Sequence, residues 1–311
     1  FFMSVYTSVN IEELKDWLKD YALDDLTDYQ GIKSGITNTN YFLMTKHDQF
    51  VLTLFEKNTI EDLPYFVDLM SHLATHAFLC PKPILKKNGT ALSILKNKPA
   101  LIVSCLKGKE LTNPAEDHCE SVGRSLAELH IKSADFEAQH QNTRNLTWIK
   151  KTAEALLNKL PEDEGQLLKE EISYQENRLY DLPKATIHGD LFKDNVLFLH
   201  NEVSGFIDFY YACTDYLILD VAIAVNDWCV NEDGSFDAAR LTAFLSAYKN
   251  IRSFNEAEEK SWNDILRLAS LRFWVSRLND FYHIKEGELT FTKDPNHFKK
   301  ILKQRIAEHT R

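Results

Sequence analysis

Cysteine is scarce in this sequence, with five residues in 311. The number is odd, no two cysteines form a Cys-x-x-Cys pair, and each lies in an apolar or helical stretch. This pattern excludes a disulfide scaffold and a cysteine-rich zinc site, and it predicts free, buried thiols in a reducing compartment. The five positions are Cys80, Cys105, Cys119, Cys213 and Cys229.

Positive charge is also in short supply. There are 36 Lys and Arg against 46 Asp and Glu, so the net charge is −10 and the pI is ≈ 5.6. A nucleic-acid-binding protein needs a basic surplus, and anionic membrane surfaces attract basic rather than acidic proteins. Apolar runs of membrane-spanning length and a basic-then-apolar signal peptide are both missing. We therefore expect a cytoplasmic protein without a nucleic-acid or membrane partner.

Material for a large core is present, because 44% of the residues are hydrophobic and 12% are aromatic. The first third reads as short strands, at 29–33, 40–45 and 50–55, whereas helical periodicity dominates from Pro114 onward. No internal repeat or low-complexity linker divides the chain. A β-rich part followed by a helical part predicts an α+β fold of two lobes.

We place the lobe boundaries by this change of pattern. The N-terminal lobe is predicted at 1–103, a hinge at 104–109 and the larger, mainly helical C-terminal lobe at 110–311.

The most informative stretch is a short β segment inside the helical part. It reads His188-Gly189-Asp190, continues to Asn195 five residues after the aspartate, and ends in Ile-Asp208-Phe. Residues 196–199 and 205–207 are strand-like, with a turn between them. A hairpin would carry Asn195 at its start and Asp208 at its end, so both side chains would face one cation.

This set of groups suits phosphoryl transfer. The reaction needs a carboxylate that orients and deprotonates the accepting hydroxyl, and hard oxygen ligands that hold Mg²⁺ against the phosphates. Asp190 fits the first role, while Asn195 and Asp208 fit the second. The five-residue step matches the protein-kinase catalytic loop H-R-D-x-x-x-x-N, with Gly189 in place of the arginine.

The pattern H-G-D-x-x-x-x-N followed by I-D-F resembles the aminoglycoside phosphotransferase and choline kinase superfamily. The resemblance implies a bilobal protein-kinase-like fold that uses ATP and Mg²⁺. It also implies that Asp220, in an apolar helix start, bonds to the backbone of the catalytic loop, although an ordinary N-cap role is an alternative.

The same resemblance implies nucleotide contacts in the N-terminal lobe and the hinge. A loop between the first two strands would line the phosphates, and hinge backbone groups would meet the adenine. The loop is no Walker A motif, since no Gly-Lys-Ser/Thr follows it. The expected nucleotide contacts are Ser34, Gly35, Thr37, Asn38, Thr53, Ser104 and Leu106.

Thr53 departs from the usual kinase pattern. It occupies the position on the third strand where kinases place the lysine that contacts the α- and β-phosphates. Either Thr53 and loop amides hold the phosphates with Mg²⁺, or a displaced lysine such as Lys46 or Lys57 reaches in. Glu61, which opens the next helix, is the candidate partner for such a lysine.

The acceptor pocket is predicted beside Asp190. Arg272 and Arg277 interrupt an otherwise apolar helix, where a guanidinium is costly unless it binds a carboxylate. Asp227 would then hold an ammonium group, and we also expect His188 to contact the acceptor. Alternatively, Arg277 pairs with Asp280 and Arg272 packs at the lobe surface.

Further stretches extend the resemblance to the homoserine kinase branch of this superfamily, at 38–42, 51–56, 188–195, 209–213 and 271–278. The resemblance implies ATP-dependent phosphorylation of L-homoserine to O-phospho-L-homoserine, a step toward threonine. Threonine in place of the strand lysine is a feature that we associate with this branch.

The residues alone leave two other functions open. A kinase for choline, ethanolamine or an aminoglycoside is one, because Tyr210, Tyr211, Trp228 and Trp274 would suit an aromatic cage. A nucleotide-binding pseudokinase is the other, motivated by the missing lysine. A monomer and a homodimer are equally compatible with the sequence.

Overall fold

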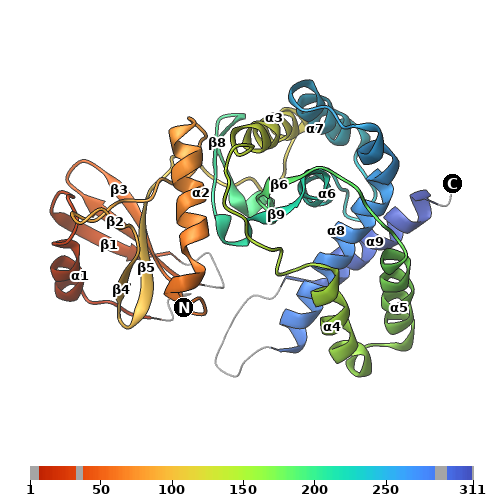
Figure 1. Ribbon diagram of the computed structural model, residues 1–311, viewed down its shortest axis with the longest axis horizontal. Helices are drawn as coiled ribbons and strands as arrows, with labels where there is room; N and C mark the ends of the chain where they lie inside the picture. Colours follow the sequence, from red (N-terminus) through yellow and green to blue (C-terminus); the bar gives the residue numbers. More distant parts are fainter. Residues whose placement is uncertain (1–6, 33–37, 284–292, 310–311) are drawn as a thin grey trace. The chain divides into compact units, whose positions relative to one another are not determined.

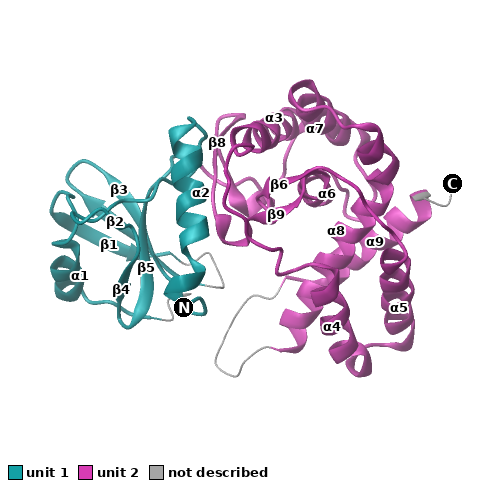
Figure 2. Cartoon of the chain, in the orientation of Figure 1, with its two compact units in different colours: residues 1–107, 289–291 teal, residues 108–288, 292–311 magenta. Residues whose placement is uncertain are grey.

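The structure is a computed structural model that describes residues 7–32, 38–283 and 293–309. The chain divides into two units, the first ending at Lys107 and the second beginning at Gly108 (Figure 2). Within the described ranges, no helix combines the length and the apolar character needed to cross a membrane.

An antiparallel five-stranded sheet in the order β1-β2-β3-β5-β4 forms the centre of the first unit (Figure 1). Its strands are β1 (Leu26–Gly31), β2 (Thr39–Thr45), β3 (Gln49–Leu54), β4 (Ser93–Leu95) and β5 (Lys98–Ser104). The helices of this unit are α1 (Ile11–Leu18), the 3₁₀ turn η1 (Ile60–Asp62) and α2 (Pro64–Thr75).

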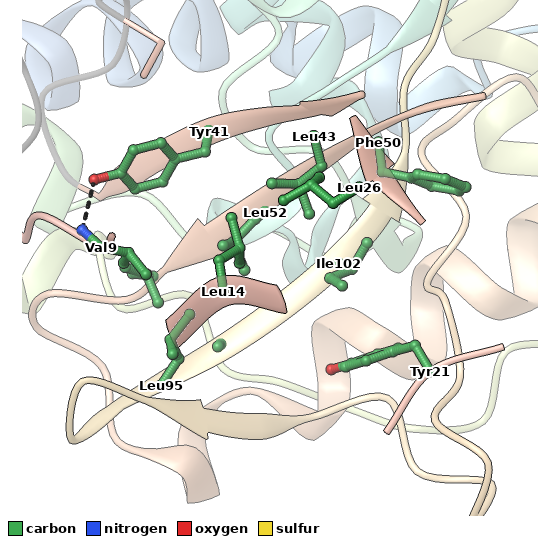
Figure 3. Packing of buried hydrophobic residues seen from close by; sticks show 12 residues of the cluster. Val9, Leu14, Tyr21, Leu26, Tyr41, Leu43, Phe50, Leu52, Leu95 and Ile102 are labelled. Atoms are coloured by element: carbon green, nitrogen blue, oxygen red, sulfur yellow. Dashed lines mark hydrogen bonds between the residues drawn. The ribbon is translucent and has the colours of Figure 1, made fainter. Parts of the chain in front are cut away.

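One face of this sheet carries the core of the first unit (Figure 3). Leu52 and Leu54 of β3 belong to this cluster, together with Leu14 of α1. Because successive side chains of a strand point to opposite faces, Thr53 lies on the other face of the sheet. Asn40 on β2 is its cross-strand partner, so a polar pair stands where the kinase lysine is usual.

The second unit is mainly helical and contains two small antiparallel pairs of strands, β6 with β9 and β7 with β8. Its strands are β6 (Lys184–Ile187), β7 (Val196–Leu199), β8 (Glu202–Phe206) and β9 (Cys213–Tyr216). The α-helices are α3 (Glu116–Lys132), α4 (Leu146–Leu156), α5 (Glu162–Glu176), α6 (Leu217–Trp228), α7 (Ala238–Ile251), α8 (Glu256–Tyr282) and α9 (Pro295–His309). Short 3₁₀ turns lie at η2 (Leu157–Lys159), η3 (Lys193–Asn195) and η4 (Phe209–Tyr211).

Helix α6 is buried along its whole length. Buried polar groups must find partners, and those of this helix do. Asn226 donates from Nδ2 to the Leu266 carbonyl and to Ser270 Oγ, each at 3.0 Å, and accepts from Arg305 Nε at 3.0 Å. The helix therefore offers a fixed frame for its other polar residues, Asp220 and Asp227.

The strands predicted at 29–33, 40–45 and 50–55 correspond to β1, β2 and β3. The helix expected from Glu61 begins as η1 and restarts at Pro64, because proline lacks an N–H and suits the first position of a helix. Strand β9 had no separate prediction. All five cysteines are free, and four of them are buried, as predicted.

Gly123 allows α3 and α7 to pack closely. A Cβ atom at this position would lie 2.2 Å from the Phe244 carbonyl oxygen of α7. We therefore expect Gly123→Ala to lower the free energy of unfolding by about 1–3 kcal/mol, measured by urea denaturation. The matched control is Gly165→Ala in α5, whose Cβ would meet only Leu157 Cδ2 at 3.7 Å.

The control should leave stability unchanged or raise it by about 0.5–1 kcal/mol, since alanine restricts the unfolded chain. An equal effect of both substitutions would contradict the close approach of the two helices.

Candidate active site

Strand pairing in the second unit brings three predicted residues together. Asp190 follows β6 by three residues, Asn195 immediately precedes β7, and Asp208 follows β8 by two residues. β7 pairs with β8 through Val196 and Phe206. The Ile207 N–H donates to the Asn195 carbonyl oxygen at 3.0 Å, which closes the hairpin beside Asp208.

Asn195 is oriented by Asp190. Its Nδ2 donates to the Asp190 carbonyl oxygen at 2.7 Å and to the carboxylate Oδ2 at 3.2 Å. With the amide nitrogen turned toward Asp190, the amide oxygen is the atom left for a cation. Asp208 has φ 62° and ψ 60°, a left-handed conformation that is uncommon for residues other than glycine and that often marks functional sites.

The carboxyl groups of Asp190 and Asp208 both have raised pKa values. Burial, and then the charge of Asp208, raises the pKa of Asp190 to about 8, although Arg272 acts in the opposite direction. Asp208 is exposed, but desolvation by the neighbouring atoms, and then the charge of Asp194, raises its pKa to about 6. Neighbouring carboxylates with raised pKa values are the kind of oxygen ligands that a divalent cation would stabilise. The donor set therefore fits Mg²⁺.

Asp220 holds the loop that precedes Asp190. Its carboxylate accepts from the His188 N–H at 2.7 Å and from the Gly189 N–H at 2.9 Å. It also contacts His130 Nε2 at 3.2 Å, and His130 Nδ1 lies 2.7 Å from the Tyr248 hydroxyl. Burial alone would raise the pKa of Asp220, but the hydrogen bond and charge of His130 leave this pKa lowered.

Gly189 is required by this loop. Its φ is 75°, and a Cβ atom there would lie 2.7 Å from the Tyr211 carbonyl oxygen. Glycine is the residue that adopts this conformation without a steric penalty. The close approach connects the loop before Asp190 with the segment after Asp208.

His188 has its ring nitrogens engaged inside the unit. Nε2 lies 3.0 Å from the Ile207 carbonyl oxygen, and Nδ1 lies 3.3 Å from the Asp190 N–H. The side chain is fully buried, and burial lowers its pKa. These contacts favour a role in holding the two halves of the site together over the contact with the acceptor that we expect from the sequence.

Asp227 is likewise engaged with the loop. Its Oδ2 accepts from the Lys193 N–H at 2.8 Å, and its Oδ1 lies 3.9 Å from Lys193 Nζ. The neighbouring Trp228 donates from Nε1 to the Leu191 carbonyl oxygen at 3.1 Å. Asp227 is only 7% exposed, so these contacts favour loop positioning over the predicted contact with an ammonium group.

The two arginines of α8 differ. Arg272 is 4% exposed, and its Nη1 has no hydrogen-bond partner among the described residues. Burial lowers its pKa, while the nearby charge of Asp190 acts in the opposite direction. The alternative of a surface position for Arg272 is therefore wrong. Arg277 donates from Nη1 to the Asp294 carbonyl oxygen at 3.1 Å and stacks over Phe298 at 4.5 Å.

The predicted nucleotide contacts belong to the first unit. Ser34, Gly35 and Thr37 lie outside the described residues. Thr53 donates from its hydroxyl to Asn40 Oδ1 at 2.8 Å. This bond engages the Thr53 hydroxyl proton.

Three further predicted contacts of the first unit have partners there. Asn38 Oδ1 accepts from the Glu56 N–H at 3.3 Å. Ser104 Oγ accepts from the Lys82 N–H at 2.9 Å, and the Leu106 carbonyl oxygen accepts from Cys105 Sγ at 3.7 Å.

The structure reveals charged residues that our sequence reasoning did not single out. Lys98 Nζ lies 2.5 Å from Glu56 Oε2, so a lysine–glutamate pair exists in the first unit between residues other than Lys57 and Glu61. Lys293 Nζ lies 2.5 Å from Asp194 Oδ2, next to the catalytic loop. Arg144 precedes α4 in a polar loop that carries no recognisable motif; only its position among polar residues could have marked it.

The fold is that of the protein-kinase-like phosphotransferases. A solved amicoumacin kinase, hAmiN, matches with a TM-score of 0.71 at 13% identity over 96% of this chain and 92% of its own. Choline kinase from Cryptosporidium parvum Iowa II matches with a TM-score of 0.69 at 16% identity over 97% of both chains. Both have a small antiparallel sheet lobe and a larger helical lobe in common with this chain.

Sequence comparisons identify the family to which this chain belongs. The model of the phosphotransferase enzyme family matches residues 28–254. A homoserine kinase of Methylobacillus flagellatus is 49% identical over 98% of this chain and 96% of its own length, and one of Paraburkholderia xenovorans is 41% identical with the same coverage. The chain therefore belongs to the phosphotransferase enzyme family, in the branch that contains the homoserine kinases.

The raised pKa of Asp190 predicts that its ionised carboxylate lowers the stability of the folded protein. Its folded-state pKa of about 8 exceeds the ordinary value of 3.8, so the folded state binds the proton more tightly. This contribution to stability is present below pH about 4 and is lost as the pH rises toward 8. Without divalent cations, Asp190→Asn should therefore melt at a higher temperature than the wild type at pH 8, with a smaller difference at pH 5.

Differential scanning calorimetry in EDTA measures this difference. Asp68→Asn, which alters an exposed carboxylate on α2, is the control and should show no comparable trend. A melting temperature of Asp190→Asn that stays at or below the wild-type value at pH 8 would contradict the raised pKa of the Asp190 carboxylate.

Proposed function

We propose that this chain is an ATP-dependent homoserine kinase, which transfers the γ-phosphoryl group of ATP to the hydroxyl of L-homoserine and forms O-phospho-L-homoserine. The observation that carries the proposal is identity of 41–49% to homoserine kinases over almost the whole chain. The cluster of Asp190, Asn195 and Asp208 supports it, because a phosphotransferase needs these groups in one place.

Asp190 is the proposed base. The hydroxyl oxygen of the acceptor attacks the γ-phosphorus, its proton moves to the Asp190 carboxylate, and the bond from the γ-phosphorus to the ADP oxygen breaks. A raised pKa suits this role, since a base works best when its pKa lies near the working pH. Asn195 orients the carboxylate through its hydrogen bond to Oδ2.

Asn195 and Asp208 are the proposed ligands of Mg²⁺. Bound there, the ion would neutralise phosphate charge and draw electron density from the γ-phosphoryl group. The remaining Asn195 amide oxygen and the Asp208 carboxylate are the hard oxygen donors that this ion prefers.

Nucleotide contacts are proposed in the first unit. Ser34, Gly35, Thr37 and Asn38 would contact the phosphates, and the backbone around Ser104 and Leu106 would contact the adenine. Thr53 donates its proton to Asn40, so we propose that its part is to position this sheet face rather than to replace the charge of a lysine.

Arg272 is the proposed contact for the acceptor carboxylate, with Arg277 as a second candidate. Arg272 is buried, lacks a partner for Nη1 among the described residues and is electrostatically linked to Asp190. A guanidinium at this place disfavours choline and ethanolamine, which carry a cation and no carboxylate.

The direct test is turnover by the purified chain with ATP, Mg²⁺ and a panel of L-homoserine, choline, ethanolamine and an aminoglycoside. We expect ADP release with L-homoserine and O-phospho-L-homoserine as the product detected by ³¹P NMR. Asp190→Asn should lower kcat on the order of 10²-fold or more while it leaves ATP binding unchanged. Turnover of choline alone would refute the amino-acid acceptor, and no turnover with any acceptor would indicate a pseudokinase.

The proposed metal ligands are tested by titration of the enzyme with Mg²⁺. Asp208→Asn should raise the Mg²⁺ concentration for half-maximal activity by at least about tenfold, because a charged ligand is replaced by a neutral one. Asp194→Asn, in the same loop but paired with Lys293, should change it by less than about threefold. An unchanged Mg²⁺ requirement in Asp208→Asn would remove Asp208 from the ligand set.

A further inference from the structure

A pocket of about 540 Å³ lies inside the second unit. The loop before α4, the end of α5, strand β9 and α8 all contribute to its lining. Although the whole protein is acidic, this lining carries four cationic side chains and one carboxylate. They are Arg144, Arg178, Lys184, Arg272 and Asp215.

Two of the four cationic side chains have surroundings that stabilise their charge. Arg178 donates from Nη2 to the Tyr174 hydroxyl at 2.6 Å, and its Nε lies 3.7 Å from Asp264 Oδ2. Lys184 is exposed to water, and its Nζ lies 4.7 Å from the centre of the Tyr216 ring. These groups need no ligand to explain their charge.

Arg144 and Arg272 are different. Arg144 Cζ lies 4.3 Å from the centre of the Trp148 ring and 5.9 Å from the centre of the Tyr211 ring. The charge of Arg144 lowers the pKa of Arg272, after the larger effect of burial, so the two guanidinium groups act on each other. Two like charges, one of them buried with an unpartnered Nη1, are costly unless an anion lies between them.

The surroundings indicate which anion this site would bind. Tyr211 connects the pocket with the proposed base, because its ring centre lies 5.9 Å from Arg144 Cζ and its carbonyl oxygen lies against Gly189, the residue before Asp190. The charge of Asp190 also acts on Arg272. Tyr211, which contacts Arg144, follows Asp208 by three residues and feels the charges of Asp190 and Asp208. A ligand held by both arginines would thus have its neighbouring atoms beside Asp190.

We propose that Arg144 and Arg272 together bind the carboxylate of the acceptor, and that Arg144 determines selectivity for amino-acid alcohols over simple amino alcohols. This inference rests on the proposed homoserine kinase function and adds a specificity residue to it. Trp148 and Tyr211 are positioning residues, because their rings lie close enough to the Arg144 guanidinium for cation–π attraction. The planar fork of each arginine matches the two oxygens of a carboxylate.

The experiment compares L-homoserine with 3-aminopropan-1-ol, which is homoserine without its carboxylate. Arg144→Ala should raise KM for L-homoserine by about 10- to 100-fold, the usual effect of losing a hydrogen bond to a charged group. Its KM for 3-aminopropan-1-ol should stay within about twofold of the wild-type value. Arg178→Ala is the matched control, because it removes a cation of the same pocket that is already paired.

Calorimetric titration with L-homoserine and with L-2-aminobutyrate, which keeps the carboxylate but lacks the hydroxyl, gives a second readout that needs no turnover. Arg144→Ala should weaken binding of both compounds, whereas Arg178→Ala should weaken neither by more than about threefold. If Arg144→Ala fails to fold, Arg144→Gln repeats the test with a side chain of similar length.

The outcomes separate this inference from the proposed function. Unchanged affinity for L-homoserine in the Arg144 variants, or equal losses for L-homoserine and 3-aminopropan-1-ol, would overturn the carboxylate site. A wild-type enzyme that binds L-2-aminobutyrate through Arg144 but phosphorylates no amino-acid alcohol would contradict the kinase function and leave the anion site standing.

Discussion

The carboxylate of Asp220 holds the loop on which the site depends. It is buried and accepts hydrogen bonds from the backbone of His188 and Gly189, while His130 contacts it from α3. These bonds determine where the chain turns after β6 and therefore where Asp190 lies. Because α6 is buried throughout, Asp220 has little freedom to move. Its hydrogen bonds therefore also restrict the movement of the loop.

The charged groups of the proposed site in the second unit are arranged so that bound ligands would neutralise them. Asp190, which is half-buried, and Asp208 are acids with raised pKa values, and Arg272 is a buried base with a lowered one. Such groups weaken the folded state until a metal ion and an acceptor neutralise them. Once bound substrates exclude water from the site, every electrostatic contact there becomes stronger.

Much of this site was predictable from short-range pattern, and the rest depends on long-range packing. The step from Asp190 to Asn195 and the hairpin before Asp208 are local features, so their spacing indicates the chemistry. The contacts of His188 and Asp227 join segments far apart in the chain, and a single sequence does not show that both side chains are already engaged. A role for Arg144 becomes apparent only from its proximity to Tyr211 and Arg272 in the fold. Both residues lie at least 67 residues away in the sequence.

The proposed mechanism requires one metal ion, held by Asn195 and Asp208, to meet the phosphate beside Asp190. A crystal structure with Mn²⁺, a non-hydrolysable ATP analogue and L-homoserine tests this requirement directly through the anomalous signal of the metal. We expect manganese on the Asn195 amide oxygen and the Asp208 carboxylate, with the homoserine hydroxyl within hydrogen-bond distance of Asp190. Manganese bound elsewhere, or a hydroxyl directed away from Asp190, would contradict it.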